Sequence, residues 1–137
     1  SDPAILIEAK PIKDDIGKKT TQIFNYMKNS KVTYGIVTNG RQLSLYSKFR
    51  VSKKCKKGRR LFDMMELKDF TNYADVLLFL SKDSVNSNRL DRLASEYNKK
   101  EYWDWKKEYK REYKDTAHDK LGLIYAKEKL IHLKDEE

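Results

Sequence analysis

Apolar residues follow two different periods along the first third of the chain. Residues 4–10, AILIEAK, form an apolar run that predicts a strand, which Pro11 ends. Residues 14–31 predict a helix that begins near a pair of aspartates. Its core-facing stripe has the helical spacing i, i+3, i+4 and i+7 and consists of Thr20, Ile23, Phe24 and Met27.

Two further strands are predicted at residues 32–38 and 42–47, because β-branched or alternating apolar residues fill both. Asn39-Gly40 between them is a strong hairpin signal, since both residue types accept positive φ. The order strand, helix, strand, hairpin strand predicts an α/β fold with a mixed sheet.

The rest of the chain reads as a basic loop followed by helices. Residues 48–60 hold eight Lys or Arg and no acidic residue, which favours a loop. Residues 61–67 resemble another strand, and residues 69–82 predict a helix. Residues 88–114 contain no Gly or Pro and predict one long helix, or two that meet near Asn98. A last helix has the apolar stripe Leu123, Ala126, Leu130 and Leu133. Taken together, the predicted elements divide the chain into a sheet-containing core over 1–83 and a helical extension over 84–137.

Composition narrows the classes of function. The 137 residues carry 30 basic and 21 acidic side chains, a net charge of +9, which favours polyanionic partners such as DNA. No apolar run exceeds about five residues, so we expect no membrane span. The single Cys55 excludes an internal disulfide and suits the cytoplasm. No glycine-rich phosphate loop is present, so an ATP-driven motor would have to lie elsewhere.

The end of the first strand raises the question of a site. Alternation places Glu8 and Lys10 on one face of a strand whose apolarity predicts burial, and buried charges are costly unless they are paired or bind metal. Gln22 and Tyr26, four residues apart, share one side of the following helix at the flank of its core stripe. Either these residues form a site, or the strand runs out into water beside an ordinary helix flank.

The ordered segments ILIEAK, QIFNY and GIVTNGRQLSLY resemble the amino-terminal nuclease domain of type I restriction enzyme R subunits, within the PD-(D/E)xK nuclease superfamily. The resemblance covers residues 4–47 and continues more loosely to about residue 82. It implies that Glu8, with the backbone carbonyl of Ala9, binds Mg²⁺ or Mn²⁺, and that Lys10 orients or activates the attacking water. Gln22 and Tyr26 would position the site or contact the DNA backbone.

The sequence departs from the family pattern in one respect. The family carries an Asp on a preceding strand, and Asp2 is too close to Glu8 in sequence to lie on a neighbouring strand. An absent upstream segment, an Asp from another chain, and a loss of catalysis all stay open.

We also expect the basic stretch to contact DNA phosphates, although it could equally be a solvated loop. The residues we assign to this contact are Lys53, Lys54, Lys56, Lys57, Arg59 and Arg60. By contrast, we expect the aromatic stripe Tyr102, Trp105, Tyr109 and Tyr113 to pack on a core or partner helix, because acidic residues are interleaved with it.

The sequence therefore predicts part of a metal-dependent DNA endonuclease of the restriction type, whose partners are DNA and other restriction-modification subunits or domains. The alternative is a catalytically silent module that keeps the nuclease fold for DNA binding or assembly. A helical protein-interaction domain unrelated to nucleic acid is a third class that stays open.

Overall fold

A computed structural model describes residues 5–16, 21–48, 59–64 and 67–134, and the chain divides into two compact units, residues 1–67 and 68–137. The first unit contains the sheet and the second is helical, which confirms the predicted mixed α/β class. The boundary that we expect between residues 83 and 84 falls inside the second unit. That the nuclease core ends there stays a prediction.

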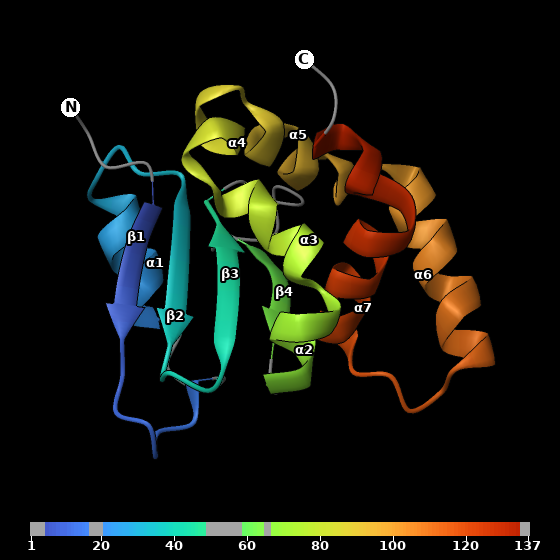
Figure 1. Ribbon diagram of the computed structural model, residues 1–137, viewed down its shortest axis with the longest axis horizontal. Helices are drawn as coiled ribbons and strands as arrows, with labels where there is room; N and C mark the ends of the chain where they lie inside the picture. Colours follow the sequence, from blue (N-terminus) through green and yellow to red (C-terminus); the bar gives the residue numbers. More distant parts are fainter. Residues whose placement is uncertain (1–4, 17–20, 49–58, 65–66, 135–137) are drawn as a thin grey trace. The chain divides into compact units, whose positions relative to one another are not determined.

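The sheet of the first unit has four strands in the order β1-β2-β3-β4 (Figure 1). β1 pairs with β2 in parallel, and the other neighbouring strands are antiparallel, so the sheet is mixed as predicted. The last strand begins two residues earlier than the sequence indicates. The strands are β1 (Ile5–Ala9), β2 (Tyr34–Thr38), β3 (Leu43–Ser47) and β4 (Arg59–Met64).

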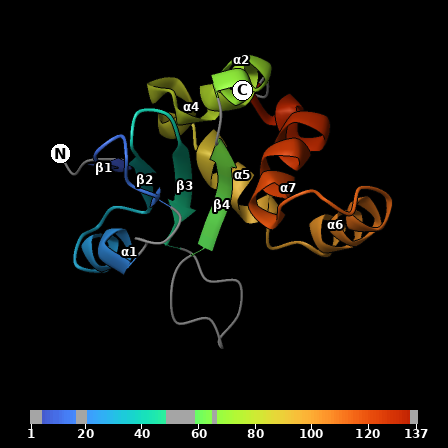
Figure 2. The same ribbon diagram turned by 90° about the horizontal axis from the view of Figure 1, so that it is seen from below.

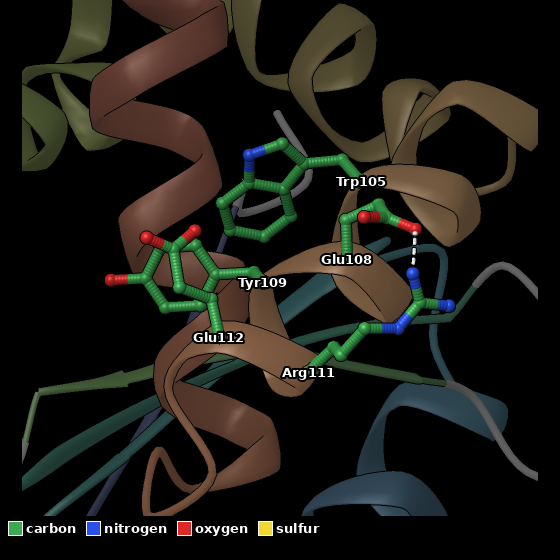
Figure 3. A pocket seen from close by; sticks show the side chains of 5 residues that line it. All are labelled: Trp105, Glu108, Tyr109, Arg111 and Glu112. Atoms are coloured by element: carbon green, nitrogen blue, oxygen red, sulfur yellow. Dashed lines mark ion pairs between the residues drawn. The ribbon is translucent and has the colours of Figure 1, made fainter.

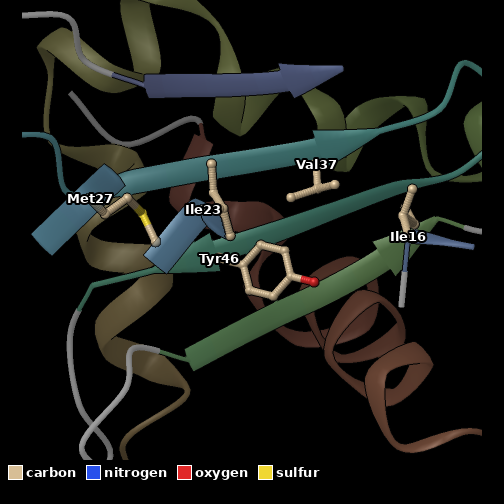
Figure 4. Packing of buried hydrophobic residues seen from close by; sticks show 5 residues of the cluster. All are labelled: Ile16, Ile23, Met27, Val37 and Tyr46. Carbon is tan, nitrogen blue, oxygen red and sulfur yellow. The ribbon is translucent and has the colours of Figure 1, made fainter. Parts of the chain in front are cut away.

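Helix α1 (Thr21–Lys28) packs on one face of this sheet against β1 and β2 (Figure 2). Of its predicted apolar stripe, Ile23 and Met27 are almost fully buried and Phe24 is partly buried, while Thr20 lies outside the described residues. The Ile23 and Met27 side chains join a core cluster with Ile16, Val37 and Tyr46 (Figure 4).

The approach of helix to strand is close because β2 carries a glycine at the contact. A Cβ atom on Gly35 would lie 2.7 Å from Ile23 Cγ1 and 3.0 Å from Met27 Sδ. This close packing places the start of α1 beside the end of β1.

The predicted start of this helix at Asp14 is wrong. The Asp14 amide donates to the Pro11 carbonyl at 2.9 Å, so this stretch forms a turn, and the first α-helical residue that the structure describes is Thr21. Tertiary contacts from the β2–β3 hairpin hold the turn in place.

Among the described strands β1 lies at the edge of the sheet, and it is partly exposed, which corrects the expectation that it is buried. Ile7 is 68% exposed, because only the opposite face of the strand is covered by α1. Leu6 packs against the core cluster on that covered face, and alternation puts Glu8 and Lys10 on the same side.

The hairpin between β2 and β3 forms where the sequence predicts it, but Asn39 and Gly40 differ in conformation. Of these two residues, only Gly40 has a positive φ, at 89°. Asn39 instead uses its side chain: Oδ1 accepts hydrogen bonds from the amides of Arg41 at 3.1 Å and Gln42 at 2.8 Å. This arrangement is an Asx-type turn.

The second unit is a succession of helices. The predicted helix over 69–82 is broken at Tyr73 and at Ser81, where the backbone becomes extended (ψ 157°) and the serine hydroxyl accepts from the Ser84 amide. The region predicted over 88–114 is two helices separated around Asn98, the second of the two alternatives. The helices are α2 (Leu67–Asn72), α3 (Ala74–Leu77), η2 (Leu78–Leu80), α4 (Lys82–Asn86), α5 (Arg89–Glu96), α6 (Lys100–Glu112), α7 (His118–Tyr125), η3 (Ala126–Leu130) and η4 (Ile131–Lys134). Among the described residues, no helix has the length and apolarity that crossing a membrane requires.

Candidate active site

Four side chains form a continuous chain of polar contacts between β1 and α1. Lys10 Nζ lies 2.8 Å from Glu8 Oε1 and also donates to Gln22 Oε1 at 2.9 Å. Gln22 Nε2 in turn donates to the Tyr26 hydroxyl at 2.7 Å. The four residues that the sequence singled out are therefore brought together, with Lys10 as the link between strand and helix.

The strand end of this chain is much more enclosed than the helix end. The side chains of Glu8 and Lys10 are only 11% and 16% exposed, whereas Tyr26 is 51% exposed. Glu8 Oε2 is buried and has no hydrogen-bond partner within the part of the chain that the structure describes. A buried carboxylate oxygen without a partner is energetically costly, so it is suited to accept a cation or a donor from a ligand.

The local sequence explains this arrangement. Alternation along β1 directs Glu8 and Lys10 towards α1, and the (i, i+4) spacing stacks Gln22 and Tyr26 on one side of the helix. The Lys10 amide donates to the Thr38 carbonyl at 2.8 Å, which continues the pairing with β2 one residue beyond the strand.

The sequence did not indicate a second layer of support from the hairpin. Asn39, which is 4% exposed, donates from Nδ2 to the Asp14 carbonyl at 2.7 Å. Arg41 Nε donates to the Ile12 carbonyl at 2.8 Å. In the sequence, the hairpin signal of Asn39-Gly40 already accounts for Asn39 as a turn residue. No further local pattern indicates its contact with Asp14.

The metal ligands implied by the resemblance stay predictions. No group of three or more His, Cys, Asp or Glu side chains that could hold a metal occurs within 5–16, 21–48, 59–64 and 67–134. Glu8 is thus the carboxylate of the site as far as the described residues go, and the Ala9 carbonyl is its expected companion. Asp2 lies outside the described residues.

The basic residues assigned to DNA divide into two groups. Lys53, Lys54, Lys56 and Lys57 lie outside the described residues. Arg59 and Arg60 belong to strand β4, so the expectation that they lie in a loop is wrong. Their role in DNA binding stays a prediction.

The Arg60 guanidinium contacts its own unit. It pairs with Asp63 at 3.2 Å and lies 5.4 Å from the centroid of the Tyr46 ring. Burial raises the pKa of the Tyr46 phenol, while the nearby Arg60 charge opposes the increase.

The aromatic stripe of α6 packs within the second unit along most of its length. Tyr102 is buried, and the centroid of its ring lies 4.9 Å from that of Tyr125. Trp105 stacks on Tyr109 with a centroid distance of 4.9 Å. Tyr113 at the end of the stripe is 49% exposed.

A hollow of about 380 Å³ opens beside the half-buried part of this stripe (Figure 3). Its lining includes Glu108 and Arg111, which form an ion pair at 2.9 Å, together with Glu112. Carboxylates beside the rings disfavour nucleic-acid bases, so the packing role expected for the stripe describes it best.

A comparison with known protein families gives a match to the first part of the chain. The family model described as type I restriction enzyme R protein N terminus (HSDR_N) matches residues 1–61, which include the Glu8–Lys10–Gln22–Tyr26 chain. The match identifies this part of the chain as a type I restriction enzyme R protein N-terminal domain, as the resemblance predicted. The comparisons with curated proteins and with solved structures gave no match.

Proposed function

We propose that the sheet-containing unit is a metal-dependent nuclease module of a restriction-type enzyme, which hydrolyses DNA phosphodiester bonds. The observation that carries the proposal is the polar chain at the end of β1, in which Lys10 joins Glu8 to Gln22 while Glu8 Oε2 has no hydrogen-bond partner. The family match over residues 1–61 supports the same class of protein.

Glu8 and the Ala9 carbonyl would hold the cation, Mg²⁺ or Mn²⁺. The fit rests on the buried, unpartnered Glu8 oxygen and on the preference of Mg²⁺ for sites with only one or two carboxylates, completed by water and substrate phosphate. A bound cation would polarise the phosphoryl oxygen and lower the pKa of the attacking water.

The remaining side chains would orient the attacking water and neutralise negative charge on the phosphate. Lys10 presents an ammonium that can hydrogen-bond the attacking water and stabilise the negative charge that increases on the phosphate in the transition state. Gln22 fixes the position of the Lys10 ammonium, and Tyr26 holds the Gln22 amide. The exposure of Tyr26 supports the proposal that this residue contacts the DNA backbone.

A second candidate function is a catalytically silent module that binds DNA or assembles with other subunits. The observation that favours it is the single carboxylate at the site, since no three-ligand group occurs among the described residues. Under either function we propose DNA and other restriction-modification subunits or domains as partners and the cytoplasm as the location, with the basic stretch from Lys53 to Arg60 contacting phosphates.

Cleavage of supercoiled plasmid DNA in Mg²⁺ and in Mn²⁺ separates the two candidates. The nuclease proposal expects metal-dependent nicking that Glu8→Gln and Lys10→Met abolish. Lys28→Met is the matched control, because Lys28 is an exposed lysine in the last turn of α1. Salt-sensitive DNA binding without nicking by any variant would instead favour the silent module.

A further inference from the structure

We propose that Asn39 is a positioning residue for Lys10: its side-chain amide fixes the segment that follows β1 and thereby holds the Lys10 ammonium in place. The inference rests on the proposed function for its catalytic consequence. It rests on the hairpin contacts alone for its structural consequence.

Asn39 makes more contacts than a turn requires. The turn itself is closed through Oδ1, which accepts from the amides of Arg41 and Gln42. The other end of the same side chain points to different partners, since Nδ2 donates to the Asp14 carbonyl at 2.7 Å and to Gln42 Oε1 at 3.0 Å. One buried side chain therefore both closes the turn and hydrogen-bonds to the segment 11–14.

The segment that leaves Lys10 is held by the hairpin at three successive points. The Lys10 amide donates to Thr38, the Ile12 carbonyl accepts from Arg41 Nε, and the Asp14 carbonyl accepts from Asn39. Ile12 is itself 66% exposed, so burial of its own side chain does not hold this part of the segment. Between Lys10 and the buried Ile16, the hydrogen bonds from the hairpin supply the contacts that the exposed Ile12 side chain does not make.

Fixing this segment matters because Lys10 has a long, flexible side chain. Its ammonium reaches Glu8 and Gln22 at once only while its own backbone stays at the end of β1. Asn39 is buried and its contact with Asp14 is partly shielded from water, whereas the Arg41 contact is exposed, so Asn39 makes the stronger of the two contacts.

The two uses of the side chain can be separated by Asn39→Asp. An Asp carboxylate keeps the oxygen that closes the turn but loses the donor, and its second oxygen faces the Asp14 carbonyl without a proton between them. Because misplacement of a catalytic group by about 1 Å can cost roughly 100-fold in rate, we expect Asn39→Asp to lower kcat for nicking by 10-fold to 100-fold. KM for the plasmid should stay unchanged.

Gly40→Ala is the matched control. Gly40 has φ 89° and nothing lies within 4 Å of a Cβ placed on it, so alanine strains the turn without contacting the site. We expect Gly40→Ala to lower the melting temperature to a similar extent while kcat stays near that of the unchanged protein. Equal losses of kcat in the two variants, or no loss in Asn39→Asp, would overturn the proposal.

Amide hydrogen exchange at Lys10 in the full chain gives a readout that does not depend on cleavage. The proposal expects faster exchange in Asn39→Asp than in Gly40→Ala, together with a changed ¹⁵N shift of the Lys10 ammonium. If the unchanged protein does not nick DNA, the proposed function fails while this measurement still tests the contact between Asn39 and Asp14. Identical exchange and shifts in both variants would overturn it.

Discussion

Replacing Lys10 with methionine tests whether the lysine ammonium weakens the binding of a cation at Glu8. Lys10→Met keeps the length of the apolar stem and removes the charge that lies 2.8 Å from Glu8 Oε1. A divalent cation bound to the unpartnered Glu8 Oε2 would lie close to this ammonium, which repels it and already neutralises part of the carboxylate charge. We therefore expect Lys10→Met to bind Mn²⁺ more tightly even though it loses nicking activity.

The size of the effect follows from the enclosure of the pair. Hydrogen bonds between charged groups contribute about 1.5–3 kcal/mol, and exposed ion pairs about 0–1 kcal/mol. The Lys10 and Glu8 side chains are 16% and 11% exposed on an edge strand, which places the pair between these limits. A change of about 1–2 kcal/mol corresponds to binding that is about 5-fold to 30-fold tighter.

Calorimetric titration of the full chain with Mn²⁺, in the absence of DNA, measures this change directly. Lys28→Met controls for the loss of one positive charge from the unit, and Glu8→Gln should remove the binding. Unchanged or weaker Mn²⁺ binding by Lys10→Met would refute the repulsion between ammonium and metal at this carboxylate.

Two further predictions concern the stability of the sheet-containing unit. Gly35→Ala should lower the free energy of unfolding by about 1–3 kcal/mol, because its Cβ would lie 2.7 Å from Ile23 Cγ1; an unchanged midpoint in urea would contradict this packing. Burial raises the pKa of the Tyr46 phenol above its ordinary 10.0, so the unfolded chain releases that proton first. Stability should fall as pH rises above 10, and pH-dependent urea denaturation should show a shallower fall for Tyr46→Phe.

The strands and the hairpin could be predicted because their signals are local. Alternation and β-branched residues mark β1, β2 and β3, and Gly40 adopts the positive φ that the turn needs. The start of α1 could not be predicted in the same way. The aspartates at 14 and 15 look like the start of a helix. The stretch is instead held as a turn by Asn39 and Arg41, which lie 25 and 29 positions later in the chain than the carbonyls they contact.

The exposure of β1 shows a second limit of local patterns. An apolar strand indicates that at least one of its faces is covered, but not whether both are. Ile7 is 68% exposed because, among the described residues, α1 covers the opposite face of β1, where Leu6 packs against the core cluster. By contrast, the positions of Glu8 and Lys10 follow from alternation alone, and this explains why the polar chain could be anticipated.

Arg60 shows a third limit of local patterns: they do not reveal a one-residue irregularity in strand pairing. Residues three apart on a regular strand point to opposite faces. The register between β3 and β4 shifts between Leu45 and Tyr46, so Arg60 lies opposite Tyr46 while Asp63 lies opposite Ser44. Arg60 and Asp63 therefore share a face and form an ion pair, which a regular alternation would not predict.

The polar chain also explains how one lysine can serve a site whose carboxylate changes partners. Lys10 has two acceptors, Glu8 Oε1 on its own strand and Gln22 Oε1 on the facing helix. If Glu8 turns to a cation, the ammonium still has Gln22, whose amide is fixed by Tyr26. An ammonium with Glu8 as its sole protein acceptor would lose that contact in an enclosed position. Under the proposed function, Gln22 and Tyr26 would therefore keep Lys10 beside the carboxylate both with and without a bound cation.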